Sequence, residues 1–426
     1  MLQHAFAQLR NGRPGPVTLE VPVDIFTGEV DESLLERYRP QRKSTPSADV
    51  TEVRELVDML LAASAPVIVA GQGILYAGAT EELVELAELT QTPVMSTLNG
   101  KSCFPENHAL SLGCGGLSRP DAIVHFLNKC DLVVGIGTSF TRSEYITPLP
   151  LKGRRYAQLT NSESDISKDY PVDFAVIGDA RPSIAAMNAE VKARLGDEGR
   201  RAEDSVREEL AALKAAFLDE WRPLLECNER PISPYRVVWD LMHCVDRTRT
   251  VVTHEAGSPR DQITPFYEAI VPHGYIGWGK TTQLGTSLGL VQGAKLARPD
   301  WHAINIMGES AMGMVGMDFE TSVRNRIGTT TIVLRNGVMG NYTNFHPVAS
   351  EKYAINELGG NYADLASALG GYAERIEDPA EIKPAIKRAL ARNDEGEPAL
   401  LEFITAEENR KATRLPDDIT YRKQYG

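Results

Sequence analysis

The stretch Ile306-Met-Gly-Glu-Ser-Ala311, with Leu334-Arg-Asn-Gly-Val-Met-Gly340 further on, decides the fold of this 426-residue chain. In both segments a short apolar run stops at glycine and at oxygen-bearing side chains, which is typical of the end of a buried strand. The spacing from Glu309 to Asn336 suits one turn, one helix (about 319–325) and one strand. Because ligands of open α/β sheets bind at the carboxyl ends of the strands, we expect these two side chains to lie together at such an edge.

These residue types indicate a magnesium–diphosphate site. Gly308 allows a ligand to approach the backbone closely, and Ser310 and Ala311 offer N–H groups to a phosphate. Glu309 and Asn336 carry hard oxygen ligands, and Mg²⁺ on a diphosphate needs few protein ligands because phosphate oxygens supply the others. Taken singly, each segment is more typical of an ordinary turn, but the two at this spacing favour the site.

Outward from this stretch, apolar strands alternate with glycine turns and amphipathic helices in two long runs. This pattern predicts an α/β fold of two doubly wound parallel-sheet domains, and the N-terminal segment either docks on them or is a short remnant of a third domain. The remnant contains a helical segment (1–10) and a strand-like run (17–21), and the polar tail is expected to be frayed. The predicted boundaries are 1–27 for the remnant, 28–48 for a linker, 49–185 for the central domain, 186–232 for a helical connector, 233–410 for the diphosphate-binding domain and 411–426 for the tail.

Composition narrows the classes of partner. The net charge of −13 argues against broad binding to nucleic acid or to anionic membranes. No apolar run approaches the length of a membrane span, and the N-terminus lacks a signal-peptide pattern. The five cysteines are scattered without metal-ligand spacing, which is typical of reduced thiols in a cytoplasmic protein.

The motifs resemble those of the thiamine diphosphate enzymes of the acetolactate synthase and pyruvate oxidase group. That family carries Gly-Asp-Gly or Gly-Asp-Ala, followed after a helix and a strand by Asn, and this chain has Gly308-Glu309-Ser310 and Asn336. Further segments follow the family order: 11–17 and 21–24 resemble the end of its pyrimidine-binding domain, 65–73, 100–106 and 178–180 its central domain, and 285–297 its cofactor-gripping helix.

The resemblance implies roles for individual residues. Mg²⁺ would be held by the side chains of Glu309 and Asn336 and the carbonyl of Val338. Leu284 stands where the family has an apolar prop beneath the thiazolium ring, although an ordinary core leucine is an equal alternative. The implied cofactor-binding residues are Gly257, Ser258, Leu284, Gly308, Ser310, Ala311, Gly337 and Met339. The chemistry would belong to the cofactor, whose ylid attacks a carbonyl.

Two features depart from the family. Glu309 replaces the usual aspartate, and its extra methylene group matters because Mg²⁺ tolerates little deviation from octahedral distances. The family's catalytic glutamate, which binds the aminopyrimidine, would precede Met1, so no residue of this chain is assigned to it. We therefore expect a hetero-oligomer in which a separate chain, carrying a pyrimidine-binding domain, supplies this glutamate. The alternative assembly is a homo-oligomer.

Flavin binding is only partly suggested. Acetolactate synthases hold FAD partly through an arginine and an acidic residue, and the matching positions here are Ser139 and Thr160. The turn at Gly71 and Gly73 and the acid Asp179 persist, but a glycine turn alone is weak support. The sequence therefore favours a protein that binds no FAD, with FAD binding as the alternative.

The resemblance implies a carboligase or lyase acting on a 2-oxo acid such as pyruvate. The alternative is a non-catalytic scaffold or regulatory subunit that retains the fold. Phe345 stands where acetolactate synthases have a tryptophan, and Tyr342, Phe345 and His346 could line the substrate entrance or pack as an ordinary loop. His254 and Arg260, near the diphosphate loop, are equally open between binding and structural roles.

Overall fold

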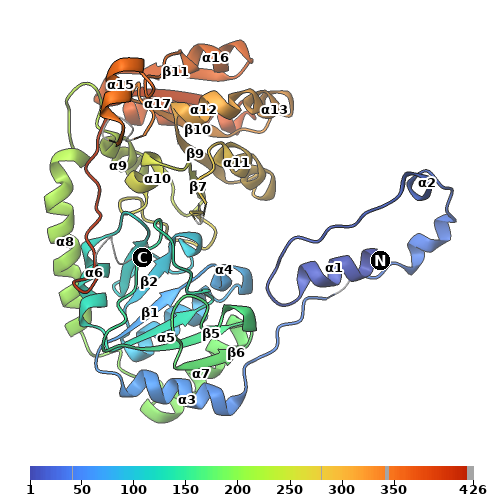
Figure 1. The fold of residues 1–426 in the computed structure, drawn as a ribbon, viewed down its shortest axis with the longest axis vertical. Coiled ribbons are helices and arrows are strands. Elements are labelled where there is room, and N and C mark those ends of the chain that lie inside the picture. The colour runs from blue at the N-terminus through green and yellow to red at the C-terminus, as the bar shows by residue number, and fades with distance from the viewer. Residues whose placement is uncertain (41, 280, 341–344, 420–426) are drawn as a thin grey trace.

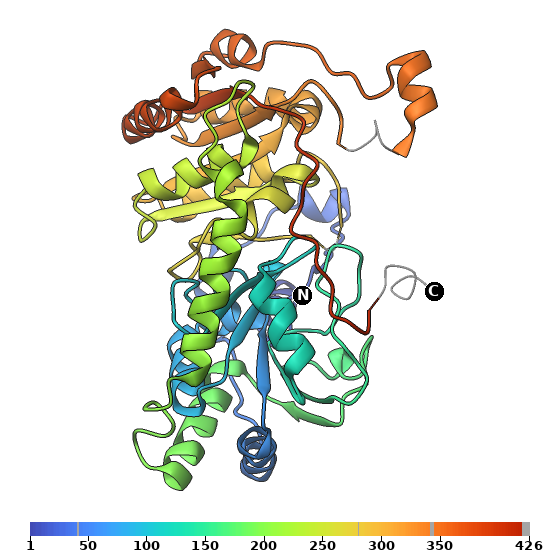
Figure 2. The same cartoon turned by 90° about the vertical axis from the view of Figure 1, so that its left-hand side faces the viewer.

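Two α/β bodies lie one above the other, and a long helix, α8 (Ser205–Leu225), runs along both (Figures 1 and 2). The coordinates are a computed structural model that describes residues 1–40, 42–279, 281–340 and 345–419. Each body contains one six-stranded, all-parallel sheet, so the predicted pair of doubly wound domains is confirmed.

The central domain has the strand order β3-β2-β1-β4-β5-β6. Its apolar strands are buried on both faces, as parallel sheets require. One face is covered by α3, α5 and α7, and the other by α6 together with part of α8. Its elements are α3 (Val50–Ala62), β1 (Pro66–Ala70), α4 (Gly73–Ala77), α5 (Thr80–Thr90), β2 (Val94–Thr97), β3 (Ser111–Gly115), α6 (Asp121–Lys129), β4 (Leu132–Ile136), β5 (Arg155–Thr160), β6 (Phe174–Ile177) and α7 (Ala180–Leu195).

The C-terminal domain has the strand order β11-β12-β10-β9-β7-β8. Helices α9 and α17 cover one face, and α11, α12, α13 and α16 cover the other. Its elements are α9 (Pro234–Cys244), β7 (Thr250–His254), α10 (Ser258–Ile263), β8 (Tyr275–Ile276), α11 (Thr286–Ala297), β9 (His302–Gly308), α12 (Glu309–Val315), α13 (Phe319–Arg324), β10 (Thr330–Arg335), α15 (Pro347–Tyr353), α16 (Tyr362–Ala368), β11 (Tyr372–Ile376), α17 (Ile382–Asp394) and β12 (Ala399–Ile404).

Most of the N-terminal arm, residues 1–40, projects away from both bodies (Figure 1). Its turn contacts the central domain, where Arg13 pairs with Asp165 and the carbonyl of Gly12 accepts a hydrogen bond from Asn161. The arm contains α1 (Leu2–Arg10), α2 (Val23–Phe26) and a 3-10 turn (Glu32–Arg37), none of which has a buried residue. The strand predicted at 17–21 is wrong: these residues belong to no helix or strand, because no neighbouring strand lies beside them to complete a ladder.

The expectation of a frayed tail is wrong for residues 411–419. The tail descends beside α8 from the C-terminal domain to the central domain (Figure 2). Ala412 is buried, and its carbonyl accepts a hydrogen bond from the backbone N–H of Arg119 at 2.8 Å. Arg119 also donates to the carbonyl of Arg414. Polar residues therefore stay ordered here because a buried arginine of the other domain binds their backbone.

The two domains meet closely at Gly277, and we predict a large effect from filling that contact. A Cβ atom on Gly277 would lie 1.7 Å from the carbonyl oxygen of Leu98, so Gly277→Ala must push the domains apart. We expect a loss of about 2 kcal/mol in the free energy of unfolding, the usual cost of overpacking. Gly289→Ala, where a Cβ meets nothing within 4 Å, is the matched control and should stabilise α11 slightly. Urea unfolding of both variants tests this, and equal stabilities would refute the tight contact.

Candidate functional site

The C-terminal sheet changes direction between β7 and β9. After β7 the chain proceeds to β8 on one side, and after β9 it proceeds to β10 on the other. At such a switch point the loops leaving adjacent parallel strands diverge and open a crevice at the carboxyl edge. The segment 255–258 follows β7, and Glu309 follows β9, so both predicted site segments lie at this crevice.

The side chain of Glu309 meets the segment that contains Asn336. Its Oε1 accepts hydrogen bonds from the backbone N–H groups of Asn336 at 3.0 Å and Gly337 at 2.6 Å. The Oδ1 of Asn336 accepts from Val338 N–H at 3.0 Å. Burial raises the pKa of the Glu309 carboxyl, although these N–H groups oppose the shift. The Glu309 side chain therefore contacts the backbone of the turn that carries Asn336.

Two glycines leave room for a ligand beside these oxygens. Gly257 has a φ of 82°, which favours glycine, and a Cβ added there would meet nothing within 4 Å. A Cβ on Gly308 would meet only Pro259, at 3.9 Å. The backbone at the ends of β7 and β9 is thus open on the ligand side, as a diphosphate cradle requires.

These residues line a cavity of about 600 Å³. Most of the predicted site residues lie in its wall: Gly257, Ser258, Leu284, Gly308, Glu309, Ser310, Ala311, Asn336, Val338 and Met339. Gly337 is not in the wall, and its N–H binds Glu309 instead. Leu284 also packs against the core cluster around Met307 and Met312, so it is both a wall and a core residue.

Of the predicted entrance residues, Phe345 lines this cavity and is exposed. His346 precedes α15 as its N-cap residue. Tyr342 lies outside the described residues. Arg260 lines the cavity while being buried, with its guanidinium 4.6 Å from the centre of the Tyr145 ring.

The sequence did not indicate that other parts of the chain reach this cavity. Leu117, Glu144 and Tyr145 come from the central domain, and Lys411 and Thr413 come from the tail. Lys411 binds Asp261 of α10 at 2.9 Å. No local motif marks these residues, because only the packing of the two domains and the tail brings them to the wall.

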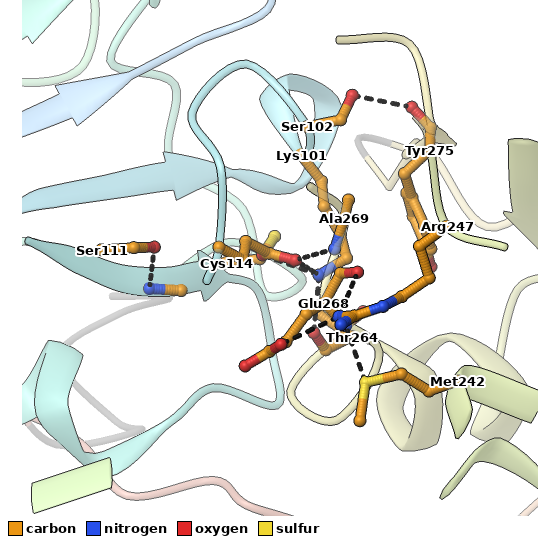
Figure 3. Close-up of polar contacts among 12 residues, drawn as sticks. Lys101, Ser102, Ser111, Cys114, Met242, Arg247, Thr264, Glu268, Ala269 and Tyr275 are labelled. Atoms are coloured by element: carbon orange, nitrogen blue, oxygen red, sulfur yellow. Dashed lines mark hydrogen bonds and ion pairs between the residues drawn. The ribbon is translucent and has the colours of Figure 1, made fainter. Parts of the chain in front are cut away.

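A buried ion pair of the central domain, between Lys101 and Glu106, contacts the end of α10 through Thr264 (Figure 3). Lys101 Nζ lies 2.7 Å from Oε1 and 2.5 Å from Oε2 of Glu106, and it donates to the carbonyl of Thr264 at 3.1 Å. Glu106 Oε2 accepts from Ala269 N–H at 2.7 Å. Thr264 follows α10, and its hydroxyl donates to the carbonyl of Arg260 at 2.6 Å. The pair therefore anchors the helix that begins at Ser258 in the cavity wall.

His254 is a fully buried structural residue rather than a wall residue. Its Nδ1 donates to the carbonyl of Glu255 at 3.1 Å, and its Nε2 accepts from Trp278 N–H at 3.2 Å. These partners require the neutral ring, and burial lowers the pKa of His254 to about 3.

We predict that His254 makes stability fall with acidification. Between pH 6.5 and 3 the unfolded chain binds a proton at His254 that the folded chain does not, so the free energy of unfolding decreases as the pH falls. From pH 7 to pH 5 this one group should contribute a loss of about 2 kcal/mol. Urea titrations of the wild type and of His254→Gln test this, because the variant should show the shallower pH dependence. Parallel curves would contradict the neutral buried histidine.

A second cavity, of about 270 Å³, lies at the carboxyl edge of the central sheet. Ser139, Thr160 and Asp179 line it, so the three positions compared with flavin sites do lie together. A Cβ on Gly71 would lie 2.3 Å from the carbonyl oxygen of Gly137. Close backbone packing between the loops after β1 and β4 therefore requires glycine there, whether or not a ligand binds.

Two family models match the chain. One, described as "Thiamine pyrophosphate enzyme, central domain", matches residues 53–187, and the other, "Thiamine pyrophosphate enzyme, C-terminal TPP binding domain", matches residues 255–403. Together they cover well over half of the chain and coincide with the two sheets. The protein belongs to the thiamine pyrophosphate (thiamine diphosphate) enzyme family, as its motifs predicted.

Curated relatives extend over nearly the whole chain. A probable acetolactate synthase large subunit of Methanocaldococcus jannaschii is 28% identical over 94% of this chain and 68% of its own length. An Escherichia coli glyoxylate carboligase is 26% identical over 92% of this chain and 67% of its own length. An acetolactate synthase of Mycobacterium avium is 26% identical over 95% of this chain and 65% of its own length.

Among the helices described, none has the length and apolarity to cross a membrane.

Proposed function

We propose that the cavity at the β7/β9 switch binds thiamine diphosphate through Mg²⁺ and that the chain acts as a carboligase or lyase on a 2-oxo acid such as pyruvate. The observation that supports this most directly is the meeting of Glu309 with the Asn336 segment beside the open glycine Gly257. The names of the relatives, acetolactate synthase and glyoxylate carboligase, support the reaction class.

The residues present fit the metal and the diphosphate. Glu309 uses only Oε1 for its two backbone donors, and a carboxylate has further lone pairs for a cation. The Oδ1 of Asn336 likewise accepts one hydrogen bond and keeps a lone pair, and the Val338 carbonyl would be the third ligand. A bound cation would favour the ionised form of Glu309, whose pKa burial raises.

When bound, thiamine diphosphate would supply a nucleophilic carbon for a carbonyl group and an electron sink for the pair released when the adjacent carbon–carbon bond breaks. The chain's own contribution is binding and orientation. Ser258, Ser310 and Ala311 would face the diphosphate, and Leu284 would support the thiazolium ring. The domain interface around Tyr145 and the tail would limit access of water to the reacting centre.

We propose that the glutamate that contacts the aminopyrimidine comes from a separate chain that carries a pyrimidine-binding domain, within a hetero-oligomer. The described carboxylates in the cavity wall support this. Asp261 is held by Arg260 and Lys411, and Glu309 by two backbone N–H groups, while Glu144 interacts with the neighbouring Tyr145 hydroxyl. Each of these three carboxylates is therefore already engaged within the chain. A non-catalytic subunit that retains the fold remains the second candidate.

We further propose that the chain works without FAD, since Ser139 and Thr160 replace the arginine and the acid of flavin-binding relatives. Flavin fluorescence on titration of FAD into the purified protein tests this, and saturable quenching would contradict it.

Calorimetric titration of the purified chain with thiamine diphosphate and Mg²⁺ tests the cofactor assignment. We expect saturable binding that EDTA abolishes. Pyruvate consumption would then be measured with and without an added pyrimidine-domain chain. Absence of cofactor binding both with and without the added pyrimidine-domain chain would overturn the assignment. Cofactor binding without pyruvate turnover, with or without that chain, would favour the non-catalytic scaffold.

A further inference from the structure

Glu255 is a fully buried acid that directly follows β7. Its carboxylate accepts four hydrogen bonds from the chain. Oε1 accepts from Ala256 N–H at 2.9 Å, and Oε2 accepts from Gly285 N–H at 3.0 Å, from Ser287 N–H at 3.3 Å and from the Ser287 hydroxyl at 2.7 Å. The two carboxylate oxygens are therefore engaged on two separate segments.

These two segments lead into two parts of the cavity wall. Ala256 leads directly into Gly257 and Ser258, and Gly285 follows directly after Leu284. Helix α11 begins after Gly285, whose missing side chain offers it no cap. Glu255 supplies that cap from a neighbouring strand, satisfying N–H groups that the first turn of a helix leaves unpaired.

We propose that Glu255 is a positioning residue that sets the distance between the diphosphate loop (256–258) and Leu284, so that one cofactor molecule can contact both. This inference rests on the proposed function. The loop and Leu284 are about thirty positions apart in sequence, and the Glu255 carboxylate is a direct link between them. Glutamine is a poor substitute, because its amide nitrogen would point a donor at the N–H and hydroxyl donors of one segment.

Glu402 provides a matched control in the same sheet. It is also fully buried, and its carboxylate accepts from Ala363 N–H at 3.1 Å and lies 3.4 Å from Arg335. It is not in the cavity wall. Both Glu402→Gln and Glu255→Gln should therefore lower the stability of the protein. Only Glu255→Gln should also disturb the distance between the diphosphate loop and Leu284.

The test compares two ligands on the full chain by calorimetry, each with Mg²⁺: thiamine diphosphate and inorganic pyrophosphate. In the wild type, thiamine diphosphate should bind more tightly, because it contacts the loop and Leu284 together. In Glu255→Gln its Kd should rise about tenfold or more, while the Kd of pyrophosphate, which uses only one side, should change less. Glu402→Gln should lower Tm and leave the ratio of the two Kd values unchanged.

Ser287→Ala removes one donor and keeps Glu255, so it reports on the same alignment if Glu255→Gln does not fold. We expect Ser287→Ala to reduce the ratio of the pyrophosphate Kd to the thiamine diphosphate Kd by a smaller factor than Glu255→Gln does. An unchanged ratio in the variants that fold would overturn the positioning role while leaving the cofactor site standing. If the wild type binds neither ligand, with or without an added pyrimidine-domain chain, the proposed function itself is overturned, and the positioning role with it.

Discussion

Glu309→Ala should weaken the binding of thiamine diphosphate in the presence of Mg²⁺ by about 100-fold or more. Loss of groups that only support metal ligands already costs about 10–100-fold, and Glu309 is the carboxylate proposed to contact the metal itself. The change also removes the acceptor for Asn336 and Gly337 N–H, so the turn that carries the second proposed ligand loses its anchor. Calorimetric titration at fixed Mg²⁺ measures the effect.

Two further variants give this experiment its controls. Glu320→Ala removes an exposed carboxylate on α13 that only pairs with Arg324, and it should bind the cofactor as the wild type does. Glu309→Asp tests the length of the side chain, since the family's usual residue is one methylene shorter and should retain Mg²⁺-dependent binding. Equal affinity of Glu309→Ala and the wild type would refute the metal site.

Glu106→Leu should cost about 3–5 kcal/mol in the free energy of unfolding. Lys101 and Glu106 are both buried, and removing the carboxylate leaves an ammonium group in the interior without its counter-ion. Ala269 N–H also loses its acceptor. Because Lys101 binds Thr264 at the end of α10, we expect weaker cofactor binding to accompany the loss of stability (Figure 3). Urea unfolding, monitored by tryptophan fluorescence, measures the loss of stability. Calorimetric titration measures the weaker cofactor binding.

The double variant Lys101→Met/Glu106→Leu separates charge from packing. Replacing both partners of a buried pair by apolar residues of similar volume is often close to neutral. We therefore expect it to recover most of the stability lost in Glu106→Leu. If the single variant is as stable as the wild type, the pair is not a significant link between the domains.

The sequence predicted the strands that contain a recognisable apolar stretch and missed the others. Those at β1, β2, β4, β7, β9, β10 and β12 were identified because strands buried on both faces are rich in consecutive apolar residues. The missed strands contain glycine, serine or charged residues or are very short: β3, β5, β6, β8 and β11. They form because an adjacent strand supplies the hydrogen-bond ladder, which no local pattern reveals.

Local sequence also indicated both halves of the proposed metal site. Glu309 and Asn336 each end a strongly apolar strand, and the parallel topology places successive strand ends at one edge, so their meeting could be predicted. The role of Glu255 could not, because its partners, Gly285 and Ser287, carry no motif that refers to it.

By itself, the sequence determined the family, the two parallel sheets and the edge at which the proposed ligands lie, because strand ends and their spacing are encoded along the chain. Only the tertiary structure decided that Tyr145 and Lys411 share a wall with Ser258, that Lys101 holds the end of α10, and that residues 411–419 are ordered. These contacts depend on how the two domains pack, and packing between distant segments leaves no periodic signal in the residues that make it.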